Sequence, residues 1–179
     1  MKWNIDDTHS HIDFSVRHMG FSTVRGRFRE FEGFLETDAD NNPVNIEVDI
    51  KTESIDTGVA DRDNHLRSAD FFDAATNPTI TFRSTSFDHK GGNRYAVTGD
   101  LTMNGITKPV TFDVEGADPI TDPFGLTRAA ASGSTEISRK EWDLTWNQVL
   151  EAGGVMVSDK VKLSFEVEIT AEQPQEAAA

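Results

Sequence analysis

The strongest constraint on the fold is a hydrophobic alternation with a period of two residues. It is clearest near the end of the chain, where Val161, Leu163, Phe165, Val167 and Ile169 are separated by Lys162, Ser164, Glu166 and Glu168. A β-strand points successive side chains to opposite faces, so such a segment has one apolar and one polar face. The alternation therefore predicts antiparallel strands that bury one side of a sheet.

The same period recurs along most of the chain, at residues 12–18, 46–51, 79–83, 95–101 and 110–114. Asn104-Gly105 lies between the last two segments and predicts a tight hairpin, because both turn positions favour positive φ. Turn-forming residues at 38–43, 88–93 and 118–125 separate other candidate strands. We count eight or nine strands, which predicts an all-β chain.

Two segments depart from this period. Residues 25–35 break the alternation, since Phe28 and Phe31 are three apart, and we interpret the break as a β-bulge that bends a strand around a closed barrel. Residues 57–72 have no strand period, and Asp61 is a candidate N-cap for a short helix across one end of the barrel.

The length of 179 residues fits a single domain. We predict one β-barrel domain over residues 1–171 and a flexible polar tail over 172–179. No apolar run approaches the roughly 18 residues of a membrane-spanning helix, and no signal-peptide segment follows Met1. We therefore expect a cytoplasmic protein without stable membrane insertion.

The chain is strongly acidic, with 31 acidic and 17 basic residues and a net charge of −14. Nucleic-acid binding relies on cations that neutralise phosphates, so we expect no nucleic-acid partner. The net charge also disfavours docking on an anionic membrane. The sequence has no cysteine, which excludes disulfides and thiolate chemistry.

No pattern of catalytic residues stands out, and we expect that the protein is not an enzyme. A G-x-S-x-G motif is absent, and Ser10 beside His9 and Asp7 is an adjacency in sequence, not a triad in space. The spacing of His9, His11 and Asp13 offers possible metal ligands, but on a flat strand they lie about 7 Å apart. We therefore expect no metal site.

The expected inward faces are rich in Phe, Ile, Val and Leu, and the chain has 12 Phe but a single Tyr. An eight-stranded barrel is either filled by its own side chains or able to hold one small ligand. Periodicity alone leaves both possibilities open. If the barrel is hollow, its apolar wall favours a hydrocarbon ligand, because each buried methylene contributes about 0.8 kcal/mol.

Several motifs resemble the YceI-like family and occur in that family's order. They are residues 7–22 (DTHSHIDFSVRHMGFS), 24–28 (VRGRF), 54–58 (SIDTG), 62–67 (RDNHLR), 70–73 (DFFD), 77–82 (NPTITF) and 99–110 (GDLTMNGITKPV). The resemblance spans the chain from Trp3 to about Ile169. It implies an extended, lipocalin-like antiparallel barrel of about eight strands that binds a polyisoprenoid or similar long-chain amphiphile, commonly as a homodimer. Many relatives are periplasmic or secreted.

On this basis we expect a carrier or sequestering protein for a polyprenyl or isoprenoid-quinone lipid, with no other cofactor. The alternatives are a binding module for fatty acids or hydrophobic compounds, and a ligand-free interaction barrel. The expected ligand contacts are Phe14, Val16, His18, Phe28, Val48, Leu66, Phe71, Phe82, Leu101, Phe112, Trp142 and Phe165.

The polar and aromatic candidates keep alternative roles. His18 follows an apolar strand face and is either a core histidine or a contact to the ligand's head group. Arg62 either anchors the helical segment, together with Asp63, or contacts the head group. Trp142 and Trp146 are expected on one strand face, in the core, the cavity wall or a dimer interface. The glycine-containing residues 151–157 are a candidate gate.

Overall fold

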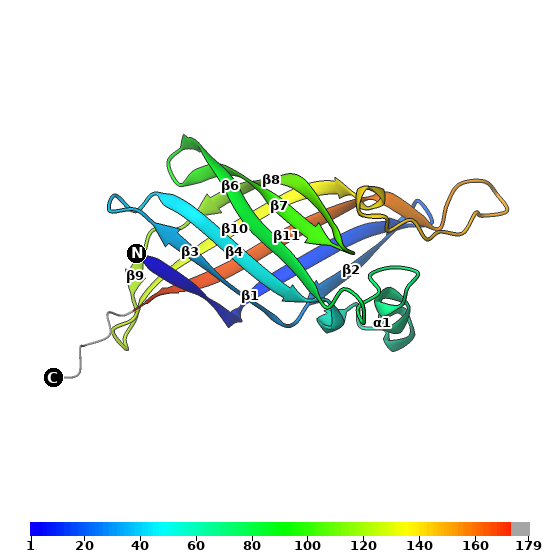
Figure 1. Cartoon of the computed structure of the whole chain (residues 1–179), viewed down its shortest axis with the longest axis horizontal. Coiled ribbons are helices and arrows are strands. Elements are labelled where there is room, and N and C mark those ends of the chain that lie inside the picture. Colours follow the sequence, from blue (N-terminus) through cyan, green and yellow to red (C-terminus); the bar gives the residue numbers. More distant parts are fainter. Residues whose placement is uncertain (173–179) are drawn as a thin grey trace.

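Long antiparallel strands make up most of the computed structural model, which describes residues 1–172 (Figure 1). The strands are β1 (Lys2–His18), β2 (Ser22–Phe28), β3 (Phe31–Thr37), β4 (Pro43–Lys51), β5 (Ile55–Asp56), β6 (Thr79–Gly91), β7 (Arg94–Met103), β8 (Ile106–Gly116), β9 (Ile120–Thr121), β10 (Thr127–Ser138) and β11 (Val157–Ala171). The helices are α1 (Ala60–Arg67) and the 3₁₀ helices η1 (Thr52–Ser54) and η2 (Arg139–Trp142).

Eight strands close into a barrel in the order β1-β3-β4-β6-β7-β8-β10-β11. The closing pair is β1 with β11, which runs from Trp3–Ala171 to His18–Val157. Closure removes the free strand edges that would otherwise attract another chain. The all-β class and the antiparallel barrel with one short α-helix are therefore confirmed.

Strand β1 is the longest side of the barrel, with 17 residues and a length of roughly 55 Å at strand spacing. Its other edge is shared, because β3 pairs with Lys2–Asn4 and β2 pairs with Ile12–His18. The bulge predicted in residues 25–35 is wrong. The alternation breaks there because β2 ends at Phe28 and a separate strand begins at Phe31.

The bulge lies instead inside β1, where Asp6 pairs with Glu168 and His11 pairs with Glu166. Four residues of β1 thus lie opposite a single residue of β11. Ser10 in the bulge replaces a ladder contact, because its hydroxyl accepts from the Glu168 N–H at 3.0 Å. The extra residues also shift the alternation: Ile5 lines the interior before the bulge and the even-numbered residues from Ile12 line it afterwards.

Helix α1 covers one end of the barrel (Figure 1). The predicted N-cap at Asp61 is wrong, because the helix begins at Ala60 and Val59 is its N-cap. The anchoring role expected for Asp63 and Arg62 is confirmed. The buried Asp63 carboxylate accepts from the Thr57 N–H at 2.8 Å and the Thr57 hydroxyl at 2.6 Å, and Arg62 Nε donates to that hydroxyl at 2.7 Å.

The hairpin predicted at Asn104-Gly105 is confirmed, with φ of 51° and 73° at the two turn residues. The tail predicted at 172–179 lies outside the described residues except for Glu172, whose N–H donates to the Lys2 carbonyl at 2.8 Å. Within residues 1–172, no helix has both the length and the apolar character that membrane crossing requires.

Trp142 is a core residue of η2 rather than a strand residue. It is 1% exposed, and its indole N–H donates to the Leu101 carbonyl at 3.0 Å. Asn104 donates its amide to the Trp142 carbonyl at 3.0 Å, which joins η2 to the β7–β8 hairpin. The indole thus packs η2 onto the end of the barrel.

We predict that Trp142→Phe lowers the free energy of unfolding by about 1–3 kcal/mol, because the buried indole hydrogen bond is lost. Urea denaturation measures the effect. Trp146→Phe is the matched control and should barely change stability. A Trp142→Phe protein of unchanged stability would contradict the core role.

Candidate functional site

An elongated cavity of about 400 Å³ lies inside the barrel. Its wall includes β1 from Ile5 to His18 and β11 from Val157 to Ile169, so it extends along most of the barrel axis. The volume falls within the range of about 300–1,000 Å³ that is usual for small-molecule pockets. The barrel is therefore hollow rather than filled by its own side chains.

The cavity wall is almost entirely hydrophobic. The polar or charged members of the wall are Asp13, His18, Arg62, His65, Arg139 and Ser164. Asp13 and Ser164 pair with each other midway along the β1–β11 ladder. The other four come from the C-terminal end of β1, from α1 and from η2, so they gather at one end of the cavity, here called the mouth.

Glycines in the strands let phenylalanine rings lie flat against the wall. Gly26 is paired with Phe14, and Gly133 with Phe165. A Cβ atom on Gly133 would lie 2.6 Å from Phe165 Cζ, and a Cβ on Gly26 would overlap the Phe14 ring in the same way. The rings thus cover neighbouring glycines instead of projecting into the cavity, which keeps the barrel hollow.

The rings form two rows along the wall. Phe28 lies between Phe14 and Phe72, with ring centroids 5.9 and 6.1 Å apart. Phe112 lies between Phe82 and Phe165, with centroids 5.6 and 5.8 Å apart. Tilted and edge-on contacts at this spacing stabilise aromatic pairs. The two rows give the cavity firm, apolar sides.

A third aromatic group stands at the mouth. His65 of α1 lies edge-on to Phe71 and to Trp146, with centroid distances of 5.1 and 4.6 Å. All three line the cavity. The His65 ring nitrogen Nε2 is 2.8 Å from an Asp70 carboxylate oxygen. The mouth is therefore narrowed by rings that also present a polar edge.

Arg139 is a buried cation at the mouth. It is 4% exposed, and its guanidinium donates to the carbonyls of Leu144, Trp146, Val157 and Ser158. Among residues 1–172, no carboxylate lies within ion-pair distance of it. Burial lowers the pKa of Arg139 below its ordinary value, although guanidinium groups stay protonated in proteins. Arg139 thus holds the connection between β10 and β11 at the mouth and adds a positive charge there.

Eleven of the twelve residues expected to contact a ligand line this cavity: Phe14, Val16, His18, Phe28, Val48, Leu66, Phe71, Phe82, Leu101, Phe112 and Phe165. Trp142 does not, and Trp146 and Leu144 lie on the wall near it instead. Sequence reasoning missed Ile5 and Arg139 as wall residues. The bulge in β1 reverses the alternation of the strand, so the sequence does not show that Ile5 faces inward. Arg139 follows β10, whose sequence has no apolar alternation.

The comparisons with known proteins agree with this architecture. A family model of the YceI-like domain matches residues 3–169. The chain belongs to the YceI-like family. A UPF0312 protein of Shewanella denitrificans is 44% identical over 137 residues, which cover 76% of this chain and 72% of the relative. The resemblance noted in the sequence motifs is confirmed.

Two solved structures are similar to this YceI-like barrel. The crystal structure of Burkholderia cenocepacia BcnA has a TM-score of 0.79 at 25% identity, over 92% of this chain and 98% of that chain. A polyisoprenoid-binding domain from Saccharophagus degradans has a TM-score of 0.69 at 16% identity, over 95% of this chain and 98% of that chain. At that identity the second likeness concerns the fold.

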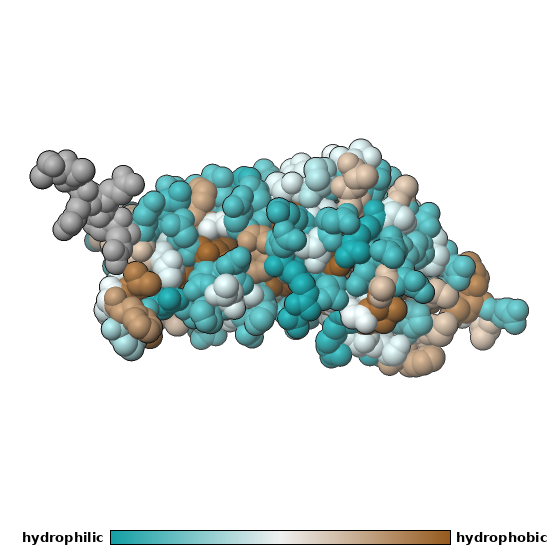
Figure 2. Space-filling view, turned by 90° about the horizontal axis from the view of Figure 1, so that it is seen from below, coloured by the Kyte–Doolittle hydropathy of each residue, from teal (hydrophilic) through white to brown (hydrophobic). Residues whose placement is uncertain are grey.

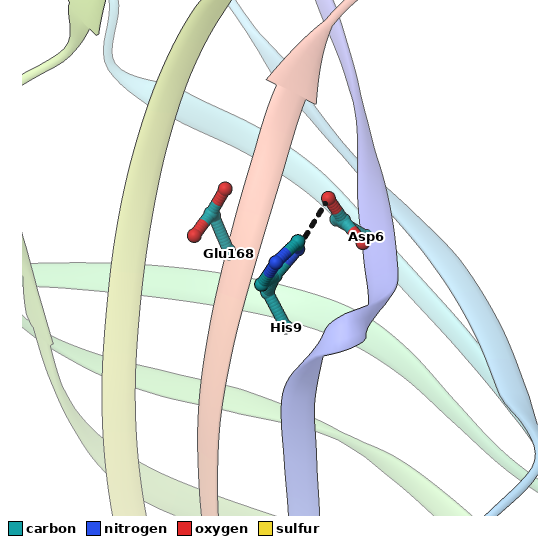
Figure 3. A group of neighbouring side chains, drawn as sticks. All are labelled: Asp6, His9 and Glu168. Carbon is teal, nitrogen blue, oxygen red and sulfur yellow. Dashed lines mark hydrogen bonds and ion pairs between the residues drawn. The ribbon is translucent and has the colours of Figure 1, made fainter. Parts of the chain in front are cut away.

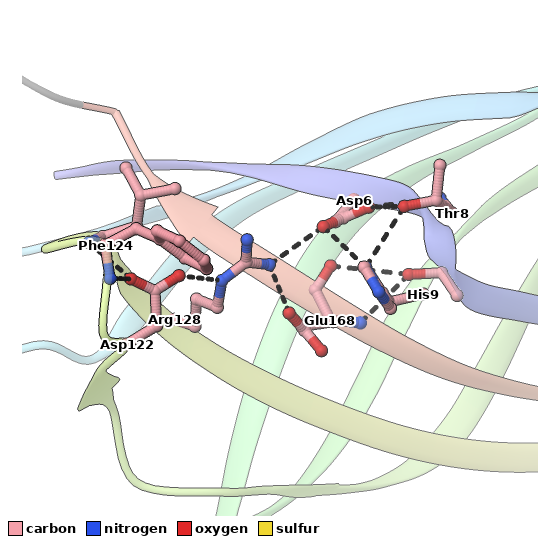
Figure 4. Close-up of polar contacts among 9 residues, drawn as sticks. Asp6, Thr8, His9, Asp122, Phe124, Arg128 and Glu168 are labelled. Carbon is pink, nitrogen blue, oxygen red and sulfur yellow. Dashed lines mark hydrogen bonds and ion pairs between the residues drawn. The ribbon is translucent and has the colours of Figure 1, made fainter.

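A second group of polar side chains lies on the outside of the YceI-like barrel. Asp6, His9 and Glu168 meet at the β1 bulge, with their potential ligand atoms within 4.8 Å of one another (Figure 3). Arg128 already pairs with both carboxylates, at 2.9 Å to Asp6, and with Asp122 at 2.7 Å (Figure 4). The arrangement is a charge-compensated network that supports the bulge.

Hydrogen bonds set the ionisation of this network. The Thr8 hydroxyl, His9 and Arg128 hold the pKa of Asp6 far below its ordinary value. The hydrogen bond and negative charge of Asp6 raise the pKa of His9 above 6.5. The contribution of protonated His9 to stability is therefore complete below pH 6.5 and is lost as the pH rises through the raised pKa.

We predict that Gly26→Ala weakens ligand binding or folding by about 1–3 kcal/mol, because the new methyl group forces the Phe14 ring toward the cavity. Its other close neighbour is the Thr57 methyl group at 3.0 Å, so no backbone atom lies in the way. Gly116→Ala is the control, since its nearest neighbour would be 3.7 Å away. Equal ligand affinity and stability in both variants would contradict this account of the hollow barrel.

We predict that His9→Gln lowers the thermal unfolding midpoint more at mildly acidic than at mildly alkaline pH. The physical reason is the loss of the ion pair between protonated His9 and Asp6, at 3.0 Å. The effect should be small, because the His9 side chain is 60% exposed. Differential scanning calorimetry at both pH values measures it. His11→Gln serves as the control, and a pH-independent effect of His9→Gln would contradict the role given to the pair.

Proposed function

We propose that this protein binds a polyisoprenoid lipid in the barrel cavity and carries or sequesters it away from water. The observation that supports the proposal is the long cavity with an almost wholly apolar wall. An isoprenoid tail is a branched hydrocarbon with no hydrogen-bonding groups, so such a wall satisfies its whole length. The tail would lie along β1 and β11 with the head group at the mouth.

The energetics explain why a long chain is needed. Each buried carbon contributes about 0.8 kcal/mol, so four isoprene units contribute roughly 16 kcal/mol. Association and ordering cost about 4–15 kcal/mol, and a micromolar complex requires a net of about 8 kcal/mol. For a short chain, the free energy gained by burial does not exceed the cost of association by enough for micromolar binding. For a chain of several isoprene units, it does.

The mouth suits a polar head group. His18, Arg62, His65 and Arg139 line this end of the cavity. Arg62 and Arg139 donate mainly to backbone carbonyls and to the Thr57 hydroxyl, so they are held in place before a ligand arrives. A phenol, quinone or phosphate would accept from the N–H groups that remain. Nothing in this set is arranged as a nucleophile with a base, which favours binding over catalysis.

The comparison with the domain from Saccharophagus degradans supports this choice of ligand by analogy, because that domain is described as polyisoprenoid-binding. A fatty acid is the alternative ligand, since it also has a hydrocarbon tail and one polar end. The two differ in the branching and length of the tail. The test therefore compares both classes directly.

We predict that the purified protein shows extra mass in native mass spectrometry and that organic extraction releases a prenyl lipid. Delipidated protein should then bind prenyl alcohols with an affinity that increases with each isoprene unit and levels off once the cavity is filled. Fatty acids matched in carbon number are the control and should bind more weakly. Release of fatty acids alone, or no binding of added prenyl lipids, would contradict the proposal.

A further inference from the structure

Exposed hydrophobic side chains gather at one end of the molecule. Met19 and Phe21 in the β1–β2 hairpin are 37% and 76% exposed, and Val149 and Val155 in the β10–β11 connection are 83% and 46% exposed. We call these four residues the apolar tip. Figure 1 shows that both loops lie at the end that carries α1, and hydrophobic surface is visible at that end in Figure 2.

The apolar tip adjoins the mouth of the cavity. The two loops are joined by a hydrogen bond from the Met19 N–H to the Met156 carbonyl at 2.8 Å. Met156 and His18, which are next to tip residues in the chain, both line the cavity. A hydrophobic molecule that leaves or enters the mouth therefore passes beside exposed apolar side chains.

Basic side chains cover the outer face of the strands behind the tip. In the ladder, Ser15 of β1 pairs with Arg25 on one side and with Lys162 on the other. Arg17, two residues further along β1, points to the same outer face, and Lys160 is two residues from Lys162. All four cations are exposed. We call Arg17, Arg25, Lys160 and Lys162 the basic face.

Three of these four cations, Arg17, Arg25 and Lys162, form no ion pair within residues 1–172, whereas Lys160 pairs with Glu136. Arg17 donates only to uncharged oxygens, of Thr23 and Gly20. In the part of the chain that the structure describes, Arg25 and Lys162 have no carboxylate within ion-pair distance. Three acids lie nearby. Glu136 is opposite Lys162 in the β10–β11 ladder, and its carboxylate is 3.8 Å from Lys160 Nζ. Asp13 is opposite Arg27 in the β1–β2 ladder, and Asp159 accepts from the Ser138 hydroxyl.

The opposite end of the barrel has an apolar patch beside a cation that is already paired. Phe124 is 90% exposed and Ile120 is 67% exposed. The nearby cation, Arg128, is paired with Asp6, Asp122 and Glu168 (Figure 4). The cation beside Phe124 is thus neutralised by carboxylates, whereas Arg25 and Lys162 behind the apolar tip have no ion pair within residues 1–172.

We propose that the apolar tip and the basic face dock the barrel on an anionic lipid bilayer, so that lipid passes between the membrane and the mouth. The proposal rests on the proposed function. Apolar side chains bury themselves at the boundary between head groups and acyl chains. Each Lys or Arg close to an anionic surface strengthens binding about fivefold. The net charge of −14 does not prevent docking, because charges farther than about 10 Å away are screened.

The charge test uses vesicles of phosphatidylcholine alone and of equal parts phosphatidylcholine and phosphatidylglycerol, in a co-sedimentation assay. The wild-type protein should bind the anionic vesicles more tightly. The double variant R25E/K162E should bind them at least about twentyfold more weakly. K90E/R94E is the matched control, with the same change in net charge at the β6–β7 hairpin, and it should bind like the wild type.

The apolar test compares Phe21→Ser with Phe124→Ser. Both residues are highly exposed, so neither substitution removes core packing. Phe21→Ser should weaken binding to both kinds of vesicle, and Phe124→Ser should leave it unchanged.

Three outcomes would overturn the docking proposal. The first is that the wild-type protein does not bind vesicles. The second is an equal loss of vesicle affinity in R25E/K162E and K90E/R94E. The third is a change of oligomeric state in Phe21→Ser, measured by light scattering, with no vesicle binding by the wild type, which would make the tip an interface between two copies. Native mass spectrometry after loading from detergent keeps the two proposals separate. R25E/K162E should still hold a prenyl lipid, whereas a wild type without lipid would contradict the cavity's function and leave the vesicle result standing by itself.

Discussion

The pairing of β1 with β11 is the contact on which the rest of the structure depends. It joins the first and last long strands over almost their whole length, so the barrel is closed only when these two strands are paired. The bulge in β1 lies in this seam. Ser10 and the Arg128 network hold it from the outside, and the register beyond it places Ile12, Phe14 and Val16 inside.

A closed barrel of eight strands has little room to spare, and this one stays hollow through the placement of its glycines. Gly26, Gly99 and Gly133 lie where a methyl group would overlap Phe14, Phe82 and Phe165. Large rings on small neighbours cover the wall without filling the interior. The placement of rings over glycines therefore leaves volume for a ligand.

Much of the barrel could be predicted from the sequence, because each strand carries its own period of two residues. Phe165, Phe112 and Phe82 point inward as that period requires. The period failed where long-range pairing decides the geometry. The end of β2 at Phe28, the start of β3 at Phe31 and the bulge at 7–10 depend on how β1 is shared between partners. The sequence pattern does not place Trp142 correctly, because no local signal marks the 3₁₀ helix η2 that follows β10.

The positions of the charges on the barrel explain more about its two ends than the net charge does. The net charge of −14 describes the whole surface, yet Arg17, Arg25 and Lys162 stand together on one outer face. At the other end Arg128 is surrounded by carboxylates that stabilise the seam. The two ends of the barrel therefore differ in what their charges do. At one end the charges hold the β1–β11 seam together. At the other end, cations that are unpaired within residues 1–172 and exposed apolar side chains lie beside the mouth, where the polar residues of the cavity wall gather.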